Sequence, residues 1–112
     1  NDQHPDHWAT YHFVMQASIE LERKHQTWKP LILTYLVHFG QWPIGQGSGP
    51  GATLRVPRGF PGRKTDWLSF SLNPIEVDTK RKAILQHQTQ VLVMGRFLLS
   101  FARKNELFIG LP

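Results

Sequence analysis

The chain has 112 residues, 40% of them hydrophobic, which predicts one folded domain rather than a disordered segment. It contains no cysteine, so a disulfide framework and a thiolate metal site are both excluded. The net charge of +5 favours an anionic partner, but neither an RNA-binding motif nor a zinc-finger spacing accompanies the basic residues. We therefore expect no specific nucleic-acid binding and interpret most of the charge as a solvated surface.

The hydropathy of the sequence bears on the cellular location of the protein. No apolar run reaches the roughly 18 residues that cross a bilayer, and no segment reads as a signal peptide. We therefore expect a cytoplasmic protein, with association with an anionic membrane surface as the alternative.

The first predicted element is a helix from residue 5 to about residue 25. Pro5 is favoured at a first helical position, and the residue before a proline, His4, is pushed toward extended geometry. Asp6 falls in the first turn, where the helix dipole favours a carboxylate. With His7, this stretch places two imidazoles and a carboxylate within four residues. It is either an ordinary helix cap or part of a metal or catalytic site.

An apolar strand is predicted next, from Leu31 to Phe39. It is typical of a strand covered on both faces in the middle of a parallel sheet. His38 lies near its carboxyl end, where ligands bind in open α/β sheets, so it either lines a pocket or is a structural histidine. The Gly/Pro-rich residues 40–62 are predicted to form a mobile loop at the rim of a pocket, with a short strand at 52–56; a purely structural excursion is the alternative. Trp42 is better placed to stack on a sugar than the other aromatic residues nearby, although packing is its simpler role.

The C-terminal half is predicted to hold one strand and two helices. Asp66 to Leu72 alternates with a period of two, which predicts a strand. Asn73-Pro74 is then expected to turn the chain. Asp78 or Thr79 is expected to cap a helix that ends near residue 89, and an apolar helix is predicted from residue 91 to 104.

The other polar residues are weaker candidates for a site. His12 lies about 140° around the helix from His7, so the two do not easily face one metal ion. His25 and His87 are expected to be exposed or to cap helices. Glu106 is expected to form an ion pair or to end a helix.

Three features, in this order, carry a resemblance. His4-Pro5-Asp6-His7 leads into a helix; Thr34-Tyr35-Leu36-Val37-His38 leads into Phe39-Gly40-Gln41-Trp42-Pro43; and Lys82–Leu85, His87–Gln90 and Phe97–Phe108 follow. Together they resemble the C-terminal half of the PIG-L/LmbE-like zinc-dependent deacetylases, over nearly the whole chain. The other signature of that family, Ala-His-Pro-Asp-Asp-Glu, is absent, and in the family it supplies two zinc ligands and the general base.

The resemblance implies a fold and a partner. The fold class would be α/β, with residues 1–112 forming a single partial domain: the C-terminal half of a Rossmann-like three-layer fold with few strands and flanking helices. The N-terminal half of the same protein, or a second copy of the chain, would complete it. Alone, the chain is not expected to be active.

The resemblance also implies an activity and a set of site residues. The enzyme would use zinc to hydrolyse the N-acetyl group of a small molecule or glycolipid that contains N-acetylglucosamine. His7 would be the zinc ligand, His4 would stabilise the oxyanion or protonate the leaving amine, and Asp6 would orient His4. His38 and Trp42 would contact the substrate. Two alternatives stay open: a non-catalytic module that binds an anionic partner or another chain, and a self-contained metal site built from the two histidines of the N-terminal motif.

Overall fold

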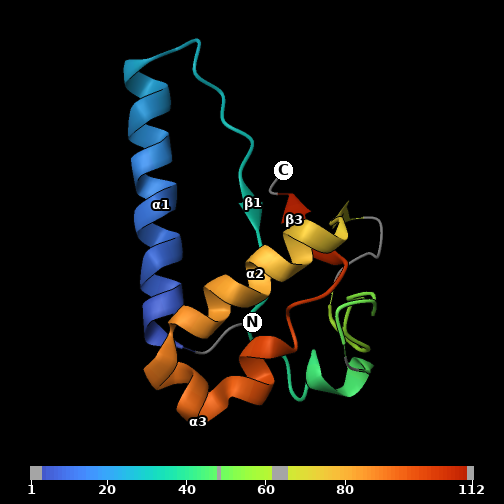
Figure 1. Ribbon diagram of the computed structural model, residues 1–112. Helices are drawn as coiled ribbons and strands as arrows, with labels where there is room; N and C mark the ends of the chain where they lie inside the picture. Colours follow the sequence, from blue (N-terminus) through green and yellow to red (C-terminus); the bar gives the residue numbers. More distant parts are fainter. Residues whose placement is uncertain (1–3, 48, 62–65, 111–112) are drawn as a thin grey trace.

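The computed structural model describes residues 4–47, 49–61 and 66–110. Within these ranges the chain forms three α-helices and a three-stranded antiparallel sheet, so the fold is mixed α/β. The elements in chain order are α1 (Pro5–Lys24), β1 (Leu33–Thr34), the short 3-10 helix η1 (Ile44–Gln46), β2 (Trp67–Ser71), α2 (Pro74–Gln86), α3 (Gln88–Leu99) and β3 (Asn105–Gly110). In Figure 1, α1 stands along one side of the molecule and an extended segment connects it to β1.

Helix α1 confirms the first prediction almost to the residue. His4 is extended (φ −75°, ψ 123°) and caps the helix, because its side chain accepts a hydrogen bond from the Asp6 amide. Arg23 and Lys24 lie in the last turn, where the helix dipole favours cations. No described residue of α1 is buried, and even Trp8, on the predicted apolar face, is 64% exposed. The local sequence therefore specifies this helix, and the rest of the described chain does not cover it.

The sheet differs from the prediction. Its order is β1-β3-β2 and both pairings are antiparallel, with Leu33 opposite Gly110 and Ser71 opposite Asn105. The prediction of a central parallel strand over residues 31–39 was therefore wrong. Only two residues of that apolar run form a strand, at the edge of the sheet, because the chain then leaves the sheet to carry Leu36 into the core.

The central strand is β3, which the sequence did not suggest. The predicted helix over residues 91–104 ends instead at Leu99, and Met94 has a non-helical backbone (φ −136°, ψ 29°). After Leu98 the amides of Phe101 and Ala102 bond three residues back, a spacing that tightens and ends the helix. The residues that follow are thereby free to pair with both β1 and β2. Glu106, on β3, forms an ion pair with Lys80 of α2. Of the two roles predicted for Glu106, an ion pair or the end of a helix, the first is confirmed.

Helix α2 starts earlier than predicted. Asn73 and Glu76 form a capping box: the Asn73 side chain accepts from the Glu76 amide at 3.0 Å, and the Glu76 carboxylate accepts from the Asn73 amide at 2.8 Å. Pro74 is the first helical residue, so Asn73-Pro74 is a helix start rather than a turn. Asp78 and Thr79, predicted as caps, lie inside the helix. The strand predicted over Asp66–Leu72, in contrast, is confirmed and spans Trp67–Ser71.

The core lies between the sheet and the Gly/Pro-rich loop. Its buried residues come from both sides, and partly buried aromatic side chains surround them: Leu36, Trp42, Leu54 and Leu107, with Phe39, Phe60, Trp67 and Phe101 packed against them. The Gly/Pro-rich loop thus contributes buried side chains to the core and covers one side of it. The predicted strand at 52–56 does not form; the backbone of Leu54 bonds instead to the side chain of Asn105. Positions 48 and 62 of the predicted loop lie outside the described residues.

None of the described helices is both long enough and apolar enough to cross a membrane.

Candidate functional site

Three histidines from two separate segments meet at the start of α1, and we call them the histidine cluster: His4, His7 and His38. The ring centroids of His4 and His7 are 4.7 Å apart and tilted by 32°. The rings of His7 and His38 are 5.7 Å apart and nearly parallel, at 12°. The first contact is local, because both residues belong to one turn. The second exists because the chain after β1 passes the first turn of α1.

The histidine cluster continues into a row of aromatic rings that ends in the core. His38 stacks on Phe97 of α3 at 5.1 Å and 10°. Phe97 meets Phe101 edge-on at 5.3 Å, and Phe101 meets Trp42 edge-on at 5.5 Å. Phe97 is a neighbour of the candidate site that sequence reasoning missed, since an apolar residue in an apolar helix carries no local signal of such a role.

The geometry at His4 bears on the role predicted for Asp6. The Nδ1 atom of His4 accepts the Asp6 amide at 3.3 Å, whereas the Asp6 carboxylate lies 3.9 Å from that atom and its side chain is 88% exposed. A nitrogen that accepts an amide proton carries none itself, so neutral His4 has its proton on Nε2. The carboxylate is beyond hydrogen-bond distance. In this geometry the backbone of Asp6, rather than its side chain, orients His4.

The histidine cluster was tested for its fit to a zinc ion. In the described part of the chain, no three His, Asp or Glu side chains are arranged to hold a metal ion. The lone pair of an imidazole lies in the plane of its ring, so two rings stacked in nearly parallel planes do not aim at one point, as His7 and His38 show. Catalytic zinc has about three protein ligands. A zinc site at His7 therefore needs ligands beyond these rings.

Trp42, a predicted substrate contact, is a core residue. It is 6% exposed, and its indole Nε1–H donates to the backbone carbonyl of Arg55 at 2.8 Å. Little of the indole face is therefore open to a ligand. His38, the other predicted contact, is exposed next to the first turn of α1.

Arg103 is a buried residue that the sequence did not single out. Its guanidinium donates to the carbonyls of Ser100, Pro43, Gln46 and Gly47 and thereby joins the end of α3 to the loop around η1. Burial lowers the pKa of Arg103, because desolvation disfavours the charged form. Arg103 is one of many basic residues in the sequence, and no local feature predicts that its side chain is buried.

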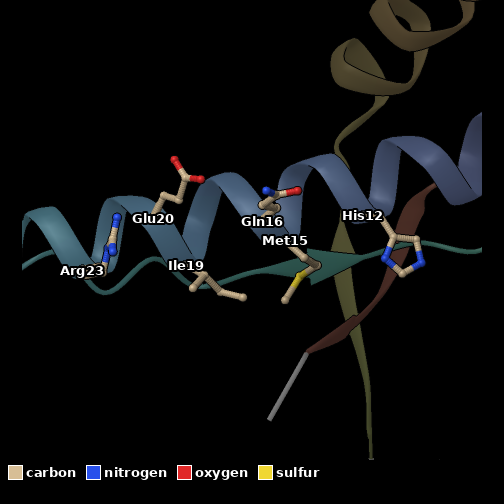
Figure 2. A pocket seen from close by; sticks show the side chains of 6 residues that line it. All are labelled: His12, Met15, Gln16, Ile19, Glu20 and Arg23. Carbon is tan, nitrogen blue, oxygen red and sulfur yellow. The ribbon is translucent and has the colours of Figure 1, made fainter.

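A shallow hollow of about 550 Å³ runs along α1 and is shown in Figure 2. Its lining residues recur at helical spacing on one face: His12, Met15, Gln16, Ile19, Glu20 and Arg23. It holds none of the predicted site residues. The hollow is a consequence of the uncovered face of α1.

The sequence and the structure were compared with known proteins. No family model matches the chain, and no curated protein or solved structure is significantly similar to it.

Proposed function

We propose that this chain is the C-terminal portion of a zinc-dependent deacetylase, which hydrolyses the N-acetyl group of a small molecule or glycolipid that contains N-acetylglucosamine. The observation that carries the proposal is the histidine cluster. His7 of the His-Pro-Asp-His motif contacts both His4 and His38, and these are residues on which the resemblance to the PIG-L/LmbE-like family depends. The resemblance implies that His4 and His7 belong to the zinc site and that His38 lines the pocket beside it.

The proposed roles follow the resemblance and the local geometry. His7 would be a zinc ligand, and zinc, when bound, supplies the activated water and polarises the amide carbonyl. His4, with Nδ1 turned to the Asp6 amide, would present Nε2–H to the oxyanion or to the leaving amine. Asp6 would stabilise the charged form of His4 when it arises. His38 and the rim near Trp42 would contact the sugar.

The same proposal includes a larger fold. The three-stranded sheet would be part of a Rossmann-like three-layer domain, of which residues 1–112 are one part. Support comes from β1 and β2, each of which has one edge without a strand partner among the described residues. Leu92 and Val93 of α3 are both 87% exposed, as expected of surfaces that another segment covers. The N-terminal half of the protein, or a second copy of the chain, would cover them and supply the other ligands and the base.

Complementation tests this function. With added zinc, the chain alone is expected to release no acetate from an N-acetylglucosamine conjugate. Activity should appear when a segment that carries Ala-His-Pro-Asp-Asp-Glu is supplied in cis or in trans. In that assembly, His7→Ala should lose zinc and activity together, whereas His4→Ala should keep zinc and lose about 100- to 1000-fold in rate.

The control is His25→Ala, at the other end of α1, which should change neither zinc content nor rate. Acetate release by the chain alone would contradict the proposal, as would a His7→Ala variant that keeps both zinc and activity. Equal zinc loss in the His4 and His7 variants would contradict the division of roles between them.

The exposed apolar side chains and the charge of +5 favour a second candidate, a non-catalytic module that binds an anionic partner or another chain. Such a module would bind its partner equally well with zinc and with a chelator. Zinc dependence of assembly therefore separates the two functions.

A further inference from the structure

A second hollow is lined by Trp42 and lies between the start of the Gly/Pro-rich loop and the segment around Arg55. We call it the arginine hollow. Its volume is about 660 Å³, within the usual range for a small-molecule site. The residues that matter to its chemistry are Phe39, Trp42, Gln46, Arg55, Val56 and Arg58. The zinc and histidine roles proposed above use none of its cationic groups.

The arginine hollow is positively charged. Arg55 and Arg58 line it and are exposed, and none of the described residues that line it is an aspartate or a glutamate. Among the described residues, neither guanidinium forms an ion pair. Two unpaired guanidinium groups at one hollow attract an anion, and their planar donor forks match the oxygens of a phosphate.

The walls of the hollow are held in place before any ligand arrives. The Gln46 side chain bonds to the backbone of Arg55 twice, once to its amide and once to its carbonyl, both at 2.8 Å. The Trp42 indole donates to the same carbonyl. The buried guanidinium of Arg103 in turn holds the carbonyls of Pro43, Gln46 and Gly47. A site preorganised in this way loses little entropy when a ligand binds.

We propose that the arginine hollow binds a phosphate monoester that carries a small ring. A phosphate monoester has close to two negative charges at neutral pH, which matches two arginines better than a single carboxylate does. The apolar side chains of Phe39 and Val56 would contact the ring. The hollow is sized for a small molecule. Trp42, near which the proposed deacetylase would contact its sugar, also lines this hollow, but the phosphate binding requires neither zinc nor the histidine cluster and is tested without them.

The test is an NMR titration of the ¹⁵N-labelled chain with phenyl phosphate, compared with phenol. The signal to follow is the Trp42 indole N–H, assigned by its loss in Trp42→Phe, because this group bonds to the Arg55 carbonyl. Phenyl phosphate should shift that signal and phenol should not. Arg55→Gln and Arg58→Gln should each weaken binding roughly tenfold, which corresponds to about 1.4 kcal/mol. Added salt should also weaken it.

Arg81→Gln is the matched control, since it removes the same charge from an exposed position on α2 and should leave the affinity unchanged. Two further arms identify the source of the phosphate. Saturation by a hexose phosphate would assign the site to a soluble molecule, whereas binding only to phosphatidylcholine vesicles that contain phosphatidylinositol 4-phosphate, whose inositol ring carries a phosphate monoester, would assign it to a lipid headgroup.

Four results would overturn the proposal. The first three are an equal shift with phenol, an equal loss of affinity in Arg81→Gln, and no shift with any phosphate. The fourth is binding to RNA alone, in a manner that Arg55→Gln leaves intact.

Discussion

Replacing Arg103 with methionine is expected to destabilise the fold by breaking the junction between α3 and the loop around η1. Arg103 is 1% exposed and holds four carbonyls: Ser100 through Nε at 2.6 Å, Gln46 through Nη1 at 3.1 Å, and Pro43 and Gly47 through Nη2 at 2.8 Å each. Methionine has a similar length and fills irregular space, so the variant removes the donors without leaving a large cavity.

The size of the effect follows from which carbonyls regain water. Pro43 is fully buried, so its carbonyl loses its donor without replacement, whereas Gly47 is exposed and its carbonyl can be hydrated. A buried acceptor left unsatisfied costs about 1–3 kcal/mol, and a hydrogen bond from a charged donor contributes about 1.5–3 kcal/mol. Desolvation of the guanidinium, which lowers the pKa of Arg103, offsets part of this. We expect a net loss of about 2–4 kcal/mol in the free energy of unfolding.

Urea unfolding, followed by tryptophan fluorescence and circular dichroism, measures this loss. Arg103→Lys should fall between the wild type and Arg103→Met, because an ammonium group cannot reach all four carbonyls at once. Arg96→Met, on the exposed surface of α3, is the control and should stay within about 0.5 kcal/mol of the wild type. An Arg103→Met protein as stable as the wild type would refute the reasoning, because it would mean that desolvation equals the contribution of the hydrogen bonds.

Three further substitutions test individual contacts and turns of the fold by the same unfolding assay. Asn105→Asp should cost about 1–3 kcal/mol of the free energy of unfolding, because the Asn105 amide that donates to the buried Leu54 carbonyl at 3.0 Å is replaced by a carboxylate, which only accepts. The loss of stability should be smaller in acid, where the new carboxyl group is protonated and can donate. An equal loss at all pH values would contradict this cause. Asn73→Ala should cost about 1 kcal/mol through the lost cap of α2, and an unchanged stability would mean that Pro74 alone starts the helix. Gly40→Ala should cost about 1 kcal/mol because its φ is +57°, whereas Gly45→Ala, with a negative φ and open space around it, should be neutral; equal effects would contradict the conformational argument.

The sequence by itself determined the elements whose signals are local. Helix α1 begins at Pro5 because a capping side chain, a proline and an acidic first turn occur together, and these act within a few residues. The alternation over Trp67–Ser71 predicted β2 in the same way. His4 and His7 lie three residues apart at the start of a helix, so local geometry alone brings their rings together. Their catalytic and metal-binding roles stay predictions of the resemblance.

Only the tertiary structure decided the rest. A run such as residues 31–39 has the composition of a buried central strand, but its partner decides whether it pairs, and here β3 takes the centre of the sheet. The polar residues 103–106 that follow the apolar helix do not by themselves specify a strand. The tightened turn after Leu98 and the buried polar contacts of Arg103 and Asn105 separate the two elements. His38 reaches the histidine cluster, and the segment with Arg55 and Arg58 closes a hollow against residues 39–46, because the chain folds back on itself. Contacts between residues distant in sequence depend on how the whole core packs, and no short stretch of sequence encodes that packing.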